Sequence, residues 1–241
     1  MERCEHLWPH GPRFYWDEGC FPPSTDSFLL AAFPRLRRGM RVCDLGAGAG
    51  LLGVLLLSRE PSLAVTGIEK DQHACGYLRR NAEENALPMT AVESDMRFSL
   101  ESLPRQSFDL VITNPPYFAP NSGAVAEGRR GGARTESTAT LGDILDAADA
   151  LLRYGGELAM VYRTDRLGEL MQEASNRRLT PKRLRLVHAR FDAAPSMALV
   201  LYKKGGHHGL TVEPPLLLTL PDGRESNEVK AAYFREKEET Q

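Results

Sequence analysis

The sequence lacks long apolar segments and is poor in cysteine. No stretch approaches the ~20 apolar residues that span a bilayer, and the opening residues MERCEHLWPHGPRF lack the apolar core of a signal peptide. The four cysteines show no CxxC pair and no disulfide framework (Cys4, Cys20, Cys43 and Cys75). These absences predict a cytoplasmic protein with no membrane partner. An apolar share of 42% over 241 residues fits a single globular domain.

Metal-binding patterns are also scarce. Cys4, His6, His10 and Cys20 offer the right atoms for a zinc ion, but they follow no known ligand spacing. We interpret them as unrelated residues near a terminus. The sequence therefore predicts no metal centre.

An overall excess of charge is absent, because the formal net charge is −2. The basic residues are nevertheless unevenly placed: eight lie between Arg177 and Lys204 against a single acid, Asp192. A second cluster lies in a glycine-rich stretch (Arg129, Arg130 and Arg134). Such clusters are typical of a surface that binds a polyanion, and a solvated surface is the alternative explanation.

Strand and helix patterns alternate along most of the chain. Apolar strands are expected at 41–45, 64–69, 89–95, 108–113 and 157–162. Helices are expected at 51–58, from near Asp71 to 87, at 141–156 with closing glycines, at 166–179, and as a short frayed helix at 230–241. This alternation predicts an α/β fold with a Rossmann-like, doubly wound and mostly parallel sheet. The segments 183–189 and 197–205 leave no room for a helix between them, which predicts an antiparallel late pair.

A glycine loop follows the first expected strand. Residues 46–53 (GAGAGLLG) contain G-x-G-x-x-G, and Glu69 ends the second strand. This pattern suits either a dinucleotide or S-adenosylmethionine, because the ribose of each needs a carboxylate there. Asp44 favours S-adenosylmethionine, since a carboxylate before the glycines repels pyrophosphate but can hold the methionine ammonium, directly or through the loop. Stabilising the loop is its alternative role. Asp95, after the third strand, can accept from an adenine amino group, and helix capping is its alternative role.

The motif NPPY at 114–117 follows the fourth expected strand. The side-chain oxygen of Asn114 and the carbonyl of Pro115 can accept hydrogen bonds from a planar amine, which stabilises the charge that develops on nitrogen as a sulfonium methyl group arrives. The Tyr117 ring can stack on a flat base. A strand-terminating turn explains the prolines but neither the asparagine nor the tyrosine. The motif therefore favours methyl transfer to a conjugated nitrogen.

Together, VCDLGAGAGLLG, GIEKD, ESD and NPPY resemble the class I S-adenosylmethionine-dependent methyltransferases that modify exocyclic or amide nitrogens. The chain most resembles the bacterial tRNA (adenine-N6)-methyltransferase family, which acts on an adenosine beside the anticodon of valine tRNA; STDSFLLAAF, ARTESTATLGDIL and GRESNEVKAAYF are similar as well. The resemblance implies S-adenosylmethionine as cofactor and tRNA as substrate. It implies cofactor binding by Thr25, Asp44, Gly46, Gly48, Gly50, Glu69 and Asp95, and base binding by Asn114, Pro115 and Tyr117.

We expect residues 1–40 to close over the cofactor and residues 41–241 to form the methyltransferase domain. The stretch 119–140 is rich in glycine and arginine and is predicted to be a mobile loop beside the fourth strand. Its arginines are candidates for RNA binding, as are three residues expected in later turns (Arg129, Arg130, Arg134, Arg178, Lys182 and Lys204).

Three other functions are compatible with parts of the pattern. A protein glutamine N5-methyltransferase of the release-factor type also uses NPPY, but about forty residues before the glycine loop are too few for its helical front domain. An rRNA or DNA adenine methyltransferase is a second alternative, although DNA enzymes of this motif order usually append a large recognition domain. A non-catalytic RNA-binding protein is the third, and the intact Asn114 and Tyr117 argue against it.

Overall fold

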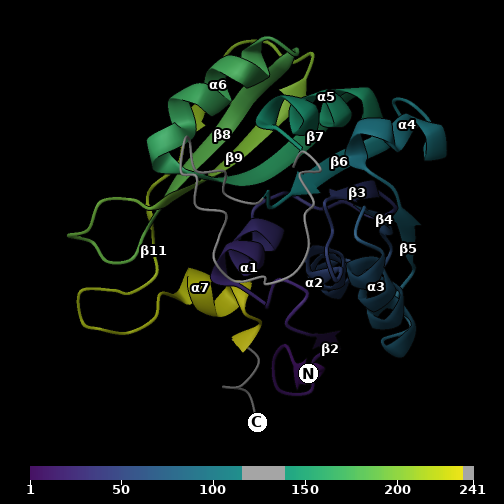
Figure 1. Cartoon of the computed structure of the whole chain (residues 1–241). Coiled ribbons are helices and arrows are strands. Elements are labelled where there is room, and N and C mark those ends of the chain that lie inside the picture. Colours follow the sequence, from purple (N-terminus) through teal and green to yellow (C-terminus); the bar gives the residue numbers. More distant parts are fainter. Residues whose placement is uncertain (116–138, 236–241) are drawn as a thin grey trace, which may run out of the picture.

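A mixed nine-stranded sheet with the order β10-β8-β9-β7-β6-β3-β4-β5, and with β11 beside β8, forms the centre of the protein (Figure 1). The structure is a computed structural model that describes residues 1–115 and 139–235. The strands of this sheet are β3 (Arg41–Leu45), β4 (Ala64–Glu69), β5 (Met89–Glu93), β6 (Phe108–Thr113), β7 (Leu152–Arg163), β8 (Leu179–His188), β9 (Met197–Lys204), β10 (Thr211–Val212) and β11 (Leu216–Leu217).

The pairing confirms the predicted fold class. Strands β5, β4, β3, β6 and β7 run parallel to one another, whereas β9 runs antiparallel to both β7 and β8. The five early strands and the late pair were therefore predicted correctly. The carboxyl ends of β3, β4 and β6 meet at one edge, where ligands bind in sheets of this kind.

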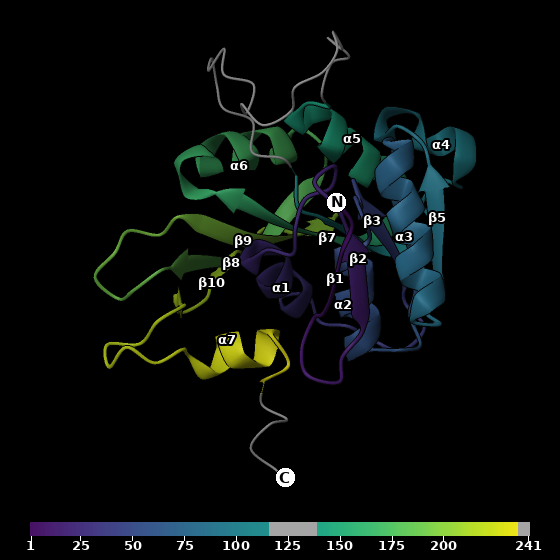
Figure 2. The same ribbon diagram turned by 60° about the horizontal axis from the view of Figure 1, so that its bottom comes forward.

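Helices cover both faces of the sheet. Figure 2 shows α4, α5 and α6 on one side and α1, α2 and α7 on the other. Alternate residues of β6 serve the two layers: Leu110 and Ile112 pack with α1 and α2, and Val111 packs with α5 and α6. The helices are α1 (Thr25–Ala32), α2 (Leu51–Arg59), α3 (Gln72–Glu84), α4 (Ser99–Ser102), α5 (Leu141–Leu151), α6 (Leu167–Ser175) and α7 (Asn227–Ala232). Within the described residues, every helix is too short or too polar to cross a bilayer.

The boundary between α5 and β7 differs from the prediction. The helix expected at 141–156 ends at Leu151, and β7 begins at once with Leu152. Gly155 and Gly156 therefore do not close a helix but lie within the strand, beside a register shift against β6. A Cβ atom on Gly156 would approach the backbone oxygens of Arg153 and Phe108 to 2.9 and 3.1 Å. The glycines allow this irregular pairing.

An N-terminal hairpin, β1 (Arg3–His6) and β2 (Arg13–Trp16), packs beside α3 and was not predicted. The buried side chain of Asn81 holds it in place: the amide exchanges hydrogen bonds with the backbone of Tyr15 and donates to the carbonyl of Ala49 at 2.9 Å. The hairpin is thus tied to the glycine loop. Residues 1–40 share a hydrophobic core with α2 and β6, and their closure over a cofactor stays a prediction.

The chain returns to the N-terminal region at its other end. Helix α7 begins at Asn227, earlier than the predicted tail helix, because Ser226 caps it by accepting a hydrogen bond from the N–H of Val229. It ends at Ala232, and residues 236–241 lie outside the described part of the chain. Figure 2 shows α7 on the same side of the sheet as α1.

Candidate active site

The predicted glycine loop lies between β3 and α2 in the conformation that glycine allows. Gly48 and Gly50 have φ angles of 54° and 87°, in the left-handed region that other residues rarely adopt. A Cβ atom on Gly48 would meet nothing within 4 Å, so open space lies against the loop at this point. Gly46, with a φ of 77°, donates its N–H to the carbonyl of Ile68 at 3.0 Å. The loop therefore offers a ligand close approach to its backbone.

Glu69 joins this loop to the start of α3. One carboxylate oxygen accepts the N–H of Gly48 at 2.9 Å, and the other accepts the N–H of Asp71 at 2.8 Å. Each carboxylate oxygen has a second lone pair. Glu69 can therefore hold the loop and still accept hydrogen bonds from two neighbouring hydroxyl groups.

Asp44 is a buried carboxylate beneath the same loop. Asp44 is 1% exposed, and neither of its oxygens makes a well-formed hydrogen bond among the described residues, although the Gly53 N–H is close enough to affect its pKa. Burial and the nearby Glu69 carboxylate raise the pKa of Asp44 to about 7, against the opposing effect of the Gly53 N–H. A buried carboxylate without a partner is costly unless a cation compensates it. Binding of a methionine ammonium by Asp44, directly or through the loop, stays a prediction.

Asp95 caps a helical turn, which was the alternative role considered for it in the sequence. It caps the 3-10 turn Met96–Phe98 by accepting the N–H of Arg97 at 3.0 Å, and it pairs with the Arg97 guanidinium at 2.6 Å. These hydrogen bonds lower the pKa of Asp95. Binding of an adenine amino group by Asp95 stays a prediction.

Asn114 follows β6 at the same edge of the sheet. The preceding Thr113 is buried and donates its hydroxyl to the carbonyl of Leu45 at 2.7 Å, which fixes the end of β6 against β3. The Asn114 side chain donates from Nδ2 to the Ser27 hydroxyl in α1 at 3.1 Å. Among residues 1–115 and 139–235, its oxygen accepts no hydrogen bond, so it can act as an acceptor. Pro115 ends the first described range, and Tyr117, Arg129, Arg130 and Arg134 lie outside the described residues.

Thr25 opens α1 and contacts the C-terminal region. Its Oγ1 lies 2.8 Å from the hydroxyl of Tyr233, whose ring stacks on Phe28 with centroids 4.2 Å apart. The fold thus brings a predicted cofactor residue and the residue that holds Asn114 into one helical turn. Ser27 and Tyr233 lie in the segments STDSFLLAAF and GRESNEVKAAYF that carry the resemblance, but neither was predicted as a site residue, because only the tertiary structure brings them to Asn114 and Thr25.

The comparisons with known proteins agree with this geometry. The family model described as the methyltransferase small domain matches residues 23–177, which include α1, the glycine loop and the end of β6. The chain belongs to this family.

Several curated relatives of this methyltransferase carry the name tRNA1(Val) (adenine(37)-N6)-methyltransferase. The protein of Aeromonas hydrophila is 31% identical over 61% of each chain, and that of Porphyromonas gingivalis is 35% identical over 66% of each chain. These matches span less than two thirds of the relatives' lengths. The similarity confirms the resemblance read from the sequence.

Solved structures confirm the class I methyltransferase fold. A predicted O-methyltransferase from Agrobacterium tumefaciens has a TM-score of 0.72 at 25% identity, over 87% of this chain and 96% of that one. The 16S rRNA N2 G1207 methyltransferase of Thermus thermophilus has a TM-score of 0.55 at 23% identity, over 85% and 50% of the two chains.

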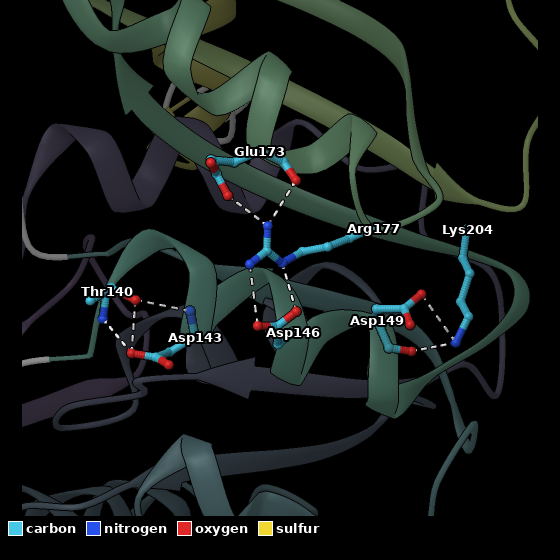
Figure 3. A network of polar contacts seen from close by, with 7 residues as sticks. All are labelled: Thr140, Asp143, Asp146, Asp149, Glu173, Arg177 and Lys204. Atoms are coloured by element: carbon cyan, nitrogen blue, oxygen red, sulfur yellow. Dashed lines mark hydrogen bonds and ion pairs between the residues drawn. The ribbon is translucent and has the colours of Figure 1, made fainter.

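Four of the eight basic residues of the methyltransferase from Arg177 to Lys204 pair with acids outside that stretch, and Arg190 pairs with Asp192 within it. Figure 3 shows Arg177 held by Asp146 of α5 and Glu173 of α6 at 2.6 and 2.7 Å. Three further pairs are Arg183–Glu213, Arg185–Glu228 and Arg190–Asp192. The local excess of cations in the sequence is therefore partly neutralised in the fold.

Lys204 was wrongly predicted to be a candidate for RNA binding. It is 7% exposed, and its ammonium group donates to the carbonyls of Asp149 and Leu152 at the end of α5, beside the Asp149 carboxylate (Figure 3). A cation at this position complements the carbonyl end of a helix. Lys204 thus closes α5 and is not accessible to a polyanion. Arg178 is exposed, and Lys182 donates to the carbonyl of His207 at 3.1 Å.

Potential metal ligands gather in a different set from the one considered in the sequence. Within the described residues, the group of three that lies within 4.8 Å is Asp17, Cys20 and His73. Asp17 and His73 already contact one another at 2.8 Å. This contact lowers the pKa of Asp17 in spite of its partial burial, and it links the segment before α1 to the start of α3.

Proposed function

We propose that this protein transfers the methyl group of S-adenosylmethionine to the exocyclic N6 of an adenine in RNA, and that the RNA is a tRNA. The observation that supports it most directly is the Asn114 amide, which lies at the end of β6 with its nitrogen engaged by Ser27 and its oxygen available. A tRNA substrate would also place the reaction in the cytoplasm.

The residues around the glycine loop fit S-adenosylmethionine. Asp44 provides a buried carboxylate for the methionine ammonium, the open loop at Gly48 allows close approach, and Glu69 has lone pairs for the ribose hydroxyls. Asp95 is the candidate for the adenine. When bound, S-adenosylmethionine supplies a methyl group that its sulfonium already activates.

The chain's part in the reaction is to hold and polarise the target amine. An exocyclic amine is a poor nucleophile, because its lone pair is conjugated with the ring. The Asn114 oxygen and the Pro115 carbonyl accept its two hydrogens and stabilise the charge that develops on nitrogen. Stacking on Tyr117 would hold the ring in plane.

The choice of RNA rests on two lines of support. The curated relatives in the comparison carry the name of a tRNA adenine-N6 enzyme, and the arginines at 129, 130 and 134 lie 12 to 17 residues after NPPY in the chain. A folded RNA offers phosphates over its whole surface, so cations beside a base pocket add affinity.

Incubation with labelled S-adenosylmethionine and separate tRNA, rRNA, DNA and release-factor samples tests the proposal. We expect label in tRNA and N6-methyladenosine after nucleoside digestion. Label in release factor alone, or in rRNA or DNA alone, would replace the proposed substrate. Label in none of the four samples would contradict the proposed function.

The pH dependence of stability is expected to report on Asp44. Its pKa of about 7 in the folded state lies above the usual aspartate value near 4. Between about pH 4 and pH 7, unfolding therefore releases a proton from Asp44. The free energy of unfolding should fall as pH rises through this range, by up to about 1.4 kcal/mol per pH unit. Thermal unfolding across this range measures the effect, and Asp44→Asn should remove it.

An ammonium group beside Asp44 would favour the ionised carboxylate. The stabilisation of the protein by S-adenosylmethionine should therefore increase with pH through about 7 in the wild type. A stabilisation that is equal at pH 5.5 and pH 8 would mean that Asp44 does not meet the ammonium.

Neutralising the arginine cluster after NPPY is expected to weaken tRNA binding. Replacing Arg129, Arg130 and Arg134 by glutamine should raise the KM for tRNA and flatten its salt dependence, because fewer counterions are released. The affinity for S-adenosylmethionine should not change, since the cofactor carries no phosphate. A control removes three exposed arginines elsewhere (Arg3, Arg38 and Arg224). An unaltered KM and salt slope in the cluster variant would exclude these arginines from the RNA site.

A further inference from the structure

The first turn of α1 contacts Asn114 through one side chain. Ser27 is 7% exposed, and its hydroxyl lies 3.1 Å from Nδ2 of Asn114. The two residues are 87 positions apart in the sequence. Within the described residues, the Asn114 side chain makes this one hydrogen bond. The bond therefore determines which way the amide nitrogen and oxygen point.

The orientation of this amide determines whether it can act on an amine. An asparagine side chain presents an acceptor oxygen on one side and two N–H donors on the other. With Nδ2 directed at Ser27, the oxygen is left to accept a hydrogen from the target amine. The reversed amide would place its N–H groups against those of the amine, where neither partner can accept.

Ser27 can hold the Asn114 amide in only one orientation if the hydroxyl hydrogen of Ser27 is donated to another group. A serine hydroxyl has one hydrogen and two lone pairs. The Ser24 hydroxyl lies 3.3 Å from that of Ser27 and can take this hydrogen. Ser27 is then an acceptor toward Asn114, and the hydrogen bonds run from Asn114 to Ser27 to Ser24.

The turn that carries Ser27 is anchored from its other side. Tyr233 bonds Thr25 through its hydroxyl at 2.8 Å and stacks on Phe28, which is 4% exposed, at an interplanar angle of 9°. Thr25 and Phe28 flank Ser27 in the chain. A helix turn fixed in this way holds the Ser27 hydroxyl at a constant place relative to the end of β6.

We propose that Ser27 is a positioning residue that orients the Asn114 amide, so that its oxygen and not its nitrogen faces the amine to be methylated. This inference rests on the proposed function of Asn114. Ser27 itself touches neither the amine nor the methyl group in this account. Its effect should therefore appear in the rate of transfer and not in the binding of cofactor or RNA.

Two measurements on Ser27→Ala test this role. The first is the ¹⁵N–¹H NMR spectrum of the Asn114 side chain, which needs no substrate. The chemical shifts of the two Nδ2 protons should be well separated in the wild type, and the difference between them should become smaller in the variant. The second is steady-state kinetics, in which kcat should fall about three- to tenfold while the KM for tRNA and the Kd of S-adenosylmethionine stay unchanged. Ser27→Cys, which keeps the volume but offers a weak acceptor, should show the same pattern and replaces Ser27→Ala if that variant does not fold.

Ser107→Ala is the control. Ser107 is a half-buried serine just before the start of β6, at the opposite end of the strand from Asn114, and its hydroxyl donates to the carbonyl of Pro104 at 2.8 Å. Its replacement should leave both the Asn114 signals and kcat unchanged. Unchanged Asn114 signals in Ser27→Ala, a wild-type kcat in that variant, or an equal loss in the control would overturn the proposal. A wild type that methylates no substrate would contradict the function of the site, while the NMR comparison would still decide whether Ser27 orients the amide.

Discussion

Asn114→Ala is expected to lower the rate of methyl transfer by about 10²–10³-fold, the loss typical of removing one group that stabilises developing charge. The affinity for S-adenosylmethionine should stay near that of the wild type, because Asp44, Gly48 and Glu69 remain in place. Calorimetry measures the affinity, and labelled methyl transfer measures the rate. Loss of cofactor binding in this variant would contradict the role given to Asn114.

A second asparagine provides the control for this change. Asn85 exchanges two hydrogen bonds with the backbone of Arg13 in the hairpin and donates a third to Asn81, away from the carboxyl ends of the strands. Asn85→Ala removes a side chain of the same size and should retain transfer activity. A comparable loss of rate in both variants would mean that general destabilisation, and not the amide at the end of β6, explains the effect.

Glu69→Ala is expected to weaken the binding of S-adenosylmethionine by about 1–3 kcal/mol, because hydrogen bonds to the two ribose hydroxyls are lost. This corresponds to roughly a 5- to 150-fold increase in Kd. The change also frees the N–H groups of Gly48 and Asp71, which loosens the glycine loop from α3. Calorimetry should therefore show weaker binding, and thermal unfolding should show lower stability of the free protein.

Glu60→Ala is the control for the loss of a carboxylate that accepts two hydrogen bonds. Glu60 also accepts two hydrogen bonds, from the N–H and the hydroxyl of Ser62, but it lies after the far end of α2. Its removal should leave the Kd of S-adenosylmethionine unchanged. If Glu69→Ala binds the cofactor as tightly as Glu60→Ala does, Glu69 is a structural residue of the loop and not a ribose ligand.

The central strands could be predicted because each carries its own local signal. β3, β4 and β6 were assigned within their observed bounds, since they are short apolar runs that end at the glycine loop, at the charged residues after Ile68, and at NPPY, respectively. The boundary at Leu151 was missed because a helix followed immediately by a strand leaves no turn residues between them. The glycines that seemed to end the helix are needed for the strand irregularity instead.

The N-terminal hairpin and the ion pairs made by the late strands could not be predicted from local patterns. All four residues of β1 are exposed, so the strand shows no alternation between apolar and polar positions. The acids that neutralise Arg183 and Arg185 come from Glu213 and Glu228, about thirty and forty residues away in the chain. A count of charges within one segment cannot include them. The same holds for Ser27, whose partner lies 87 positions away.

The bond between Thr25 and Tyr233 has a consequence for the order in which the protein is assembled during translation. Its partners are 208 positions apart, so the first helix leaves the ribosome long before its anchor is synthesised. Closing so long a loop is entropically costly and follows the pairing of nearer elements. The sheet can form earlier, but the turn that holds Asn114 is completed only when Tyr233 emerges. A nascent chain that stops shortly before Tyr233 is thus expected to contain the sheet and yet be inactive.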